Sequence, residues 1–284
     1  MTSEVIVLRT IVAQPGAMTA SAAHAGVLVR RWREQRRRSQ LDISVSTGIS
    51  TRHLSYVETG RSTPSRTMIE RLSDELDIPL RDRNEIYLAA GLAPAHRERS
   101  LTDLGSARAA VEAILRGHEP NPSVAVNARW DMLTCNDAMA RFLAAVPDEL
   151  RGPPLNMLRV TLHPDGLASR LLNPAQARAS ALRRVRRQLE RGADPSLADL
   201  LAELESYPSP SASRIDAPTD ADDIATPMRL ATDYGELSLL YAVTVFGSPR
   251  DITMDETAIE TFFAADDFTR QVLDAMAEHA PVGD

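Results

Sequence analysis

The chain has 284 residues, of which 43% are hydrophobic and only 4% aromatic, and its formal net charge is −7. Since a domain commonly holds about 100–200 residues, this length favours two domains. No uninterrupted apolar run approaches the roughly 18 residues of a membrane span, and the single cysteine, Cys135, excludes an internal disulfide and a cysteine-rich zinc site. We therefore expect a cytoplasmic protein with no membrane partner, metal or cofactor.

Charge is distributed unevenly along the chain, and all 32 basic residues are arginine. Residues 24–99 contain 14 arginines and 10 acidic residues, a balance of +4, whereas residues 100–284 contain 17 arginines and 28 acidic residues, a balance of −11. A negative total usually argues against a nucleic-acid partner, but phosphates are attracted by local basic surfaces. The first hundred residues are therefore the candidate nucleic-acid-binding region.

The N-terminal part predicts an arm followed by a helical domain. Residues 1–23 lack the pattern of a secretory signal, and we expect a disordered or weakly ordered arm. Apolar spacing, capping residues and glycines then predict five helices that form an all-α domain over residues 24–92, and the polar, proline-containing segment 93–105 is the predicted linker. The five expected ranges are 24–38, 41–47, 51–58, 65–76 and 82–91.

The second and third of these helices have the pattern of a helix-turn-helix. Gly48 can adopt the left-handed conformation of the turn, Ile49 can fill the core behind it, and Ser44 is small enough to lie under the next helix. Leu54 and Val57 are expected to bury the third helix, which leaves a surface rich in hydrogen-bond donors on its other side. The candidate DNA-binding residues on and beside that surface are Gln40, Ser50, Thr51, Arg52, Ser55, Tyr56, Arg61, Ser62 and Arg66.

The segment QLDISVSTGISTRHLSYVETGRSTPS, from Gln40 to Ser65, strongly resembles the lambda-repressor-like (XRE) family of helix-turn-helix transcriptional regulators. The likeness covers residues 24–91. It implies that Gln40, Thr51, Arg52 and Ser55 contact bases or phosphates, with Arg52 suited to guanine, and that Arg61, Ser62 and Arg66 hold the DNA backbone. The alternative is a protein-binding or antitoxin-like module whose arginines form an ordinary solvated surface.

The remaining residues, 106–284, predict a second domain of mixed α+β structure. Leu101, Leu104, Val111 and Leu115 share one helical stripe, which predicts a connector helix packed against either the core or a second copy of the chain. A hairpin of strands at 124–126 and 132–135, broken helices from 138 to 204, an exposed loop at 206–227, strands at 228–231, 237–246 and 252–263, and a last helix after residue 266 are expected to follow.

Several pieces of this half resemble the MmyB-like ligand-binding domain of actinobacterial-type regulators, over roughly 105–275. They are Trp130-Asp131, Asn136, Asn156-Met-Leu-Arg159, His163-Pro164, Phe246-Gly-Ser-Pro-Arg-Asp251 and Glu260-Thr-Phe-Phe-Ala-Ala-Asp-Asp267. The resemblance implies a PAS-like fold, in which an antiparallel sheet flanked by helices surrounds a pocket for a small apolar ligand such as a fatty acid. The chain departs from the family at Ala264-Ala265, where a proline is more common.

The candidate ligand-binding residues are Trp130, Asn136, Arg159, His163 and Phe246, and most of them have a structural alternative. Trp130 can pack the hairpin, and Asn136 can cap the following helix. Arg159 and His163 can clamp a carboxylate, or form an internal ion pair with one of the many acidic residues. The nearby arginines at 183, 184, 186 and 187 are interpreted as solvated surface rather than as a second DNA contact.

Together these features predict a homodimeric regulator that binds a palindromic DNA operator, with half-sites about 10 base pairs apart or a multiple of that spacing, and that responds to its ligand. One alternative is that the C-terminal domain only dimerises or binds a protein. Another is an enzyme, but the sequence has no glycine-rich phosphate loop, no Gly-x-Ser-x-Gly motif and no histidines at metal-ligand spacing, and we expect no catalytic residues.

Overall fold

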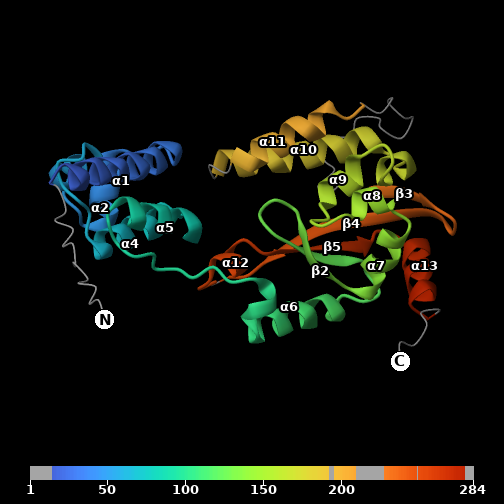
Figure 1. Cartoon of the computed structure of the whole chain (residues 1–284). Helices are drawn as coiled ribbons and strands as arrows, with labels where there is room; N and C mark the ends of the chain where they lie inside the picture. Colours follow the sequence, from blue (N-terminus) through green and yellow to red (C-terminus); the bar gives the residue numbers. More distant parts are fainter. Residues whose placement is uncertain (1–14, 192–194, 209–226, 248, 279–284) are drawn as a thin grey trace, which may run out of the picture. The chain divides into compact units, whose positions relative to one another are not determined.

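The computed structural model describes residues 15–191, 195–208, 227–247 and 249–278 (Figure 1). The chain divides into two compact units, Met1–Arg97 and Glu98–Asp284, with the division inside the segment that was expected to be a linker.

The first unit contains the five expected helices. They are α1 (Pro15–Gln35), α2 (Gln40–Thr47), α3 (Thr51–Glu58), α4 (Arg66–Glu75) and α5 (Leu80–Ala89). The start of α1 differs from the expectation, because residues 15–23, assigned to a weakly ordered arm, are helical. Five alanines between residues 17 and 25 explain this, since alanine is the best helix former, and proline is well tolerated at a first helical position. Residues 1–14 of the expected arm lie outside the described residues.

The hydrophobic core of the first unit holds α3 in place by packing against one side of this helix. Trp32 on α1, Leu54 and Val57 on α3 and Leu72 on α4 are almost completely buried in one cluster. Gly26 lets α1 approach the end of α3 closely, because a Cβ atom there would lie only 2.0 Å from the carbonyl oxygen of Val57. The third helix is therefore anchored by its buried side and by direct packing of its last turn.

The second unit is built on a five-stranded sheet with the order β2-β1-β5-β4-β3, in which every neighbouring pair is antiparallel. The strands are β1 (Ser123–Val126), β2 (Met132–Cys135), β3 (Met228–Thr232), β4 (Gly235–Val245) and β5 (Ala258–Ala264). The predicted hairpin of β1 and β2 and the α+β class are confirmed. Of the loop expected at 206–227, residues 209–226 lie outside the described residues.

Helical segments cover both faces of this sheet (Figure 1). Alternate residues of β1 point in opposite directions: Val124 and Val126 join a cluster with α7, α9, α10 and α11, whereas Ala125 joins a cluster with η1, α6 and α12. The segments are η1 (Leu101–Leu104), α6 (Ser106–Gly117), α7 (Asp137–Ala144), α8 (Asp148–Arg151), α9 (Met157–Leu162), η2 (Leu167–Arg170), α10 (Pro174–Arg191), α11 (Pro195–Ser206), α12 (Ile252–Asp255) and α13 (Asp267–Glu278), where η denotes a 3₁₀ helix.

Two expectations for this unit need correction. The stripe from Leu101 to Leu115 is not one helix, because η1 and α6 are separated at Gly105, and its side chains pack with Met254 and Ile259 inside the unit. The stripe is therefore core. The strand expected at 252–263 begins only at residue 258, since Asp251 caps a short helix by accepting a hydrogen bond from the Thr253 N–H at 3.1 Å.

Candidate nucleic-acid interface and ligand site

The turn between α2 and α3 is fixed by local hydrogen bonds. The Ser39 Oγ accepts from the Asp42 N–H at 3.1 Å, and the Asp42 carboxylate accepts from the Ser39 N–H at 2.8 Å, which starts α2 with a capping box. The bond from the Ser39 N–H, and then the nearby Ser39 hydroxyl, hold the pKa of the Asp42 carboxylate below its usual value. Gly48 ends α2 in the left-handed conformation, at φ 71°, and the Ser50 Oγ caps α3 by accepting from the His53 N–H at 3.2 Å. The predicted role of Gly48 is confirmed.

One side of α3 is buried, whereas on the other side the first turn is exposed and Ser55 and Tyr56 are half-buried. Leu54 and Val57 have no exposed surface, and Ile49 is only 8% exposed. Thr51 and Arg52 are exposed at the start of the helix. The first turn therefore offers a hydroxyl and a guanidinium to an outside partner, as a recognition helix requires.

Tyr56 gathers two arginines beside this first turn. The Arg52 Nε donates to the Tyr56 hydroxyl at 3.1 Å, and the Arg52 guanidinium carbon lies 5.4 Å from the ring centre. The Arg61 guanidinium lies 6.0 Å from the same ring. Cation–π contacts of this kind orient a guanidinium without using its terminal amino groups. Among the described residues nothing hydrogen-bonds to the terminal amino groups of Arg52, so they stay available.

A buried carboxylate at the end of α3 connects the helices around it. Glu58 is 6% exposed and accepts two bonds from Arg33 of α1, from Nε at 2.7 Å and from a terminal amino group at 2.8 Å. The Gln40 side-chain amide donates to the same carboxylate at 2.9 Å. These bonds raise the pKa of Arg33, because the carboxylate stabilises its charge. Gln40 is thus oriented by an internal partner.

The other polar residues near this surface differ in their exposure and in the hydrogen bonds that they make within the unit. Arg66 packs over Tyr87 at 4.7 Å and donates to the carbonyl oxygen of Ala93 at 2.9 Å, whereas Arg61 is exposed and Ser62 is half-buried. Arg36 donates to the carbonyl oxygens of Leu76 and Asp77 just after α4, at 2.8 and 2.9 Å. Some arginines of this unit therefore donate hydrogen bonds to the free carbonyl oxygens at a helix C-terminus.

In the second unit, four polar side chains meet on the sheet face under α10. The Oε1 atom of Glu260 accepts from Trp130 Nε1 at 3.1 Å, from the Tyr241 hydroxyl at 2.5 Å and from Arg184 at 3.2 Å. Glu260 is 3% exposed, and the Arg184 guanidinium lies 4.3 Å above the Tyr241 ring. Burial, and then the neighbouring carboxylate, raise the pKa of Tyr241. We call these four residues the Glu260 cluster.

A second polar cluster joins α9 to α11. Arg159 makes two hydrogen bonds to the Glu203 carboxylate, both at 2.7 Å, and the Tyr207 hydroxyl donates to the same group at 2.6 Å. The His163 ring lies edge-on to Tyr207, with centres 5.1 Å apart. Arg159 holds the pKa of Glu203 below its usual range, while burial and then the bond to Glu203 raise the pKa of Tyr207 to about 12.

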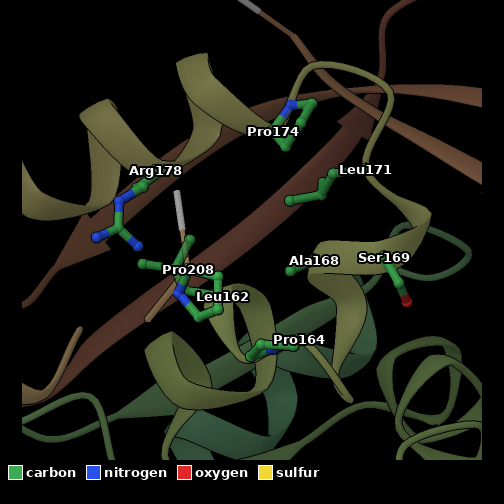
Figure 2. A pocket seen from close by; sticks show the side chains of 8 residues that line it. All are labelled: Leu162, Pro164, Ala168, Ser169, Leu171, Pro174, Arg178 and Pro208. Carbon is green, nitrogen blue, oxygen red and sulfur yellow. The ribbon is translucent and has the colours of Figure 1, made fainter. Parts of the chain in front are cut away.

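Next to this cluster is a hollow of about 220 Å³ with largely apolar walls (Figure 2). It lies between the end of α9, η2 and the first turns of α10. The residues that line it are Leu162, Pro164, Ala168, Ser169, Leu171, Pro174, Arg178 and Pro208. Pro164 follows His163 and Pro208 follows Tyr207 in the chain, so the hollow borders the residues around Arg159.

Both units match known families. A helix-turn-helix domain family matches residues 24–86, and the MmyB-like transcription regulator ligand-binding domain family matches residues 107–276, which is more than half of the chain. The chain belongs to the MmyB-like family. The uncharacterized HTH-type transcriptional regulators Mb0023 of Mycobacterium bovis and Rv0023 of Mycobacterium tuberculosis are each 33% identical to it over 70 residues. That stretch is 25% of this chain and spans about a quarter, 27%, of each relative.

The five residues expected to bind ligand in the MmyB-like domain are not brought together. Trp130 is in the Glu260 cluster, and Arg159 and His163 adjoin the hollow. Phe246 packs on the opposite face of the sheet, beside η1 and α12. Asn136 is 4% exposed and caps α7: its Oδ1 accepts from the N–H groups of Ser123 and Met139 at 2.9 and 3.0 Å. The structural alternatives given for Trp130, Asn136 and Arg159 describe their observed contacts.

Sequence reasoning missed several residues that organise these sites. Glu58 was noted only for ending a helix, and Glu260 only as part of a family motif. Arg184 was interpreted as solvated surface, which is wrong, because its guanidinium is half-buried against Tyr241 and Glu260. Strand alternation alone predicts a solvent-facing Glu260 beside the buried Ile259, and the need for a buried partner follows only from the helices that cover both faces of the sheet.

No helix in the part of the chain that the structure describes is both long and apolar enough to cross a membrane. Within the described ranges, no group of three or more histidine, cysteine, aspartate or glutamate side chains is arranged to hold a metal ion.

Proposed function

We propose that this chain is a sequence-specific DNA-binding transcriptional regulator that acts in the cytoplasm. The observation that carries the proposal is the first turn of α3, where Thr51 and Arg52 are exposed while Leu54 and Val57 anchor the helix. The names of the relatives, HTH-type transcriptional regulators, support it.

Within this proposal each residue of the interface has a role. The terminal amino groups of Arg52 suit the O6 and N7 atoms of guanine in the major groove, and Thr51 and Ser55 suit bases or phosphates. Gln40, held by Glu58, donates to the DNA from the start of α2. The DNA backbone is held by the remaining members of the interface, which are Ser50, Tyr56, Arg61, Ser62 and Arg66. The Ser50 hydroxyl oxygen accepts the capping bond of α3, and its O–H and backbone N–H are the groups that can donate to a phosphate.

We also propose that the protein binds as a homodimer to a palindromic operator. A two-fold protein on two-fold DNA requires half-sites separated by about 10 base pairs or a multiple of that spacing. An electrophoretic mobility-shift assay on DNA from upstream of the gene tests the DNA-binding proposal. Arg52→Ala should weaken specific binding about 10-fold to 100-fold, as the loss of a bidentate guanine contact predicts.

Arg116→Ala is the matched control, because it removes an exposed arginine from α6 of the other unit. It should leave the affinity for the operator unchanged. Equal affinities of the wild type and Arg52→Ala would exclude α3 as the recognition helix. Equal losses in both variants would indicate binding by net charge alone.

For the C-terminal domain we propose a PAS-like ligand sensor that binds a small apolar molecule of the fatty-acid type. The family to which the domain belongs and the apolar hollow support this part. Native mass spectrometry of the purified protein tests it, since a co-purifying small molecule supports a sensor. A dimer free of any small molecule would instead favour a domain that only dimerises or binds a protein.

A further inference from the structure

Among the described residues that line the hollow in the second unit, most are apolar and one, Arg178, is a cation. Leu162 and Leu171 are buried beneath it, and Pro174 and Ala168 form its sides. Figure 2 shows Arg178 extending from α10 beside Pro208, with Leu171 and Ala168 across from it. A concave apolar surface with a single charged group is the usual composition of a small-molecule site.

The charge of Arg178 is less well compensated than that of its neighbours. Arg159 and Arg186 each bond to a glutamate, Arg186 to Glu205 at 2.6 Å. Arg178 is half-buried and donates to the backbone carbonyl oxygen of Glu205 at 2.9 Å, but none of the described carboxylates lies within ion-pair distance of it. A partly desolvated guanidinium without a carboxylate favours an anion, which can accept two parallel hydrogen bonds from it.

The volume limits the size of an occupant. About 220 Å³ is below the roughly 300–1,000 Å³ of sites for drug-sized molecules, but above the roughly 150 Å³ of an apolar cavity that holds benzene. In proportion to benzene, the hollow takes a hydrocarbon of about eight or nine carbons. A longer chain would have to extend outside it.

We infer that the hollow binds the hydrocarbon part of a small monocarboxylate and that Arg178 binds the carboxylate. This rests on the proposed sensor function of the domain and adds to it the site, the charged partner and the approximate length of hydrocarbon that the hollow holds. None of the residues expected from the sequence to bind ligand lines the hollow, although Arg159 and His163 adjoin it.

Isothermal titration of the full chain with sodium octanoate tests the inference, with 1-octanol as the uncharged probe of equal length and palmitate as the long probe. Octanoate should bind at one saturable site. Arg178→Gln should weaken octanoate about tenfold or more, as the loss of a charge-assisted hydrogen bond predicts, and should leave 1-octanol unchanged. Palmitate should bind no more than about threefold tighter than octanoate, since its additional carbons lie outside the hollow.

Two kinds of variant serve as controls. Arg183→Gln removes an exposed arginine from the same helix and should leave octanoate affinity unchanged. Ala168→Leu and Ala168→Phe fill the hollow to different extents, so both probes should weaken, and the smaller change keeps the test usable where the larger one prevents folding.

Several results would overturn the inference: equal octanoate affinities of Arg178→Gln and Arg183→Gln, full affinity in the folded Ala168 variants, much tighter binding of palmitate, or no saturable binding of octanoate. Mobility-shift assays on the same preparations separate these failures from a failure of the proposed function. If the wild-type protein binds the operator but does not bind octanoate, only the inference is refuted. Arg178-dependent octanoate binding without operator binding supports the inference and refutes the DNA-binding proposal.

Discussion

Arg99 and Asp251, which are 152 residues apart in the chain, are joined by a hydrogen bond of 3.0 Å between the Arg99 Nε and the Asp251 carboxylate. Asp251 is 5% exposed and also caps α12. The Thr253 hydroxyl adds a bond of 2.5 Å to the carbonyl oxygen of Arg99. The segment that enters the second unit is therefore fastened to the connection between β4 and β5, the strands that carry Tyr241 and Glu260.

The two partners of this bond should differ in their effect on stability. Asp251→Ala removes both a helix cap and an ion pair, so we expect it to lower the free energy of unfolding of the second unit by about 2 kcal/mol. Arg99→Ala removes only a half-exposed partner and should cost less than about 1 kcal/mol. Urea unfolding measures both values, and Arg97→Ala, an exposed arginine two residues earlier, should have no effect. Equal costs for Arg99→Ala and Asp251→Ala would contradict the dominance of the cap.

We expect substitutions in the Arg33–Glu58 ion pair to lower the free energy of unfolding of the first unit strongly. The side chains are only 11% and 3% exposed, so removing one partner leaves a buried charge. Breaking a buried pair in this way typically costs about 3–5 kcal/mol, and Arg33→Ala and Glu58→Ala should each approach that range.

A double-mutant cycle separates this pair from simple loss of packing. The double variant should lose less stability than the sum of the single variants, because neither charge is then left alone. Trp32 in the first unit and Trp130 in the second are the two tryptophans of the chain, so fluorescence in a Trp130→Phe background reports the first unit. Strict additivity of the two losses would show that the pair is not coupled.

The features that could be predicted from the sequence are those with local causes. Gly48 was assigned to the turn and Asn136 to a helix cap, and the hydrogen bonds within a few residues of each explain why a local pattern was enough. Local composition misled at residues 252–255, where β-branched residues favour a strand but the cap of Asp251 starts a helix.

The polar clusters could not be predicted because their members are distant in the chain. Arg184 and Glu260 are 76 residues apart, and Arg159 and Glu203 are 44 apart. An amphipathic pattern places Arg184 away from the apolar side of α10, but it does not show that β4 passes there with Tyr241. The geometry of the candidate DNA-binding surface therefore follows from one turn and one helix that are contiguous in the sequence, whereas the polar clusters of the second unit depend on contacts between distant segments.

The Glu260 cluster predicts a contrast between two tyrosines of the same strand region. Tyr241→Phe removes a buried donor to a carboxylate, and bonds of this kind contribute about 1.5–3 kcal/mol. Tyr234 is 62% exposed, so Tyr234→Phe should change the free energy of unfolding by less than about 0.5 kcal/mol. Urea midpoints of the two variants check this, and a loss in Tyr234→Phe as large as that in Tyr241→Phe would indicate that the cluster has no special weight.

The Arg159–Glu203 bond predicts how stability depends on pH. Arg159 lowers the pKa of Glu203 in the folded state, so the resulting stability is fully present above the ordinary glutamate pKa of about 4.3 and is lost as the pH falls through the lower folded value. Arg159→Gln should therefore be less stable than the wild type at about pH 7, and the difference should shrink below about pH 4, where Glu203 takes up a proton in both proteins. Both side chains are more than a third exposed, so added salt should reduce the difference in stability as well.

Urea midpoints measured from about pH 7 to about pH 3 test this pH dependence, with Arg170→Gln as the exposed control that should follow the wild type at every pH. A difference that stays constant from about pH 7 to about pH 3 would mean that Arg159 stabilises the domain through its packing, because packing does not depend on the charge of Glu203.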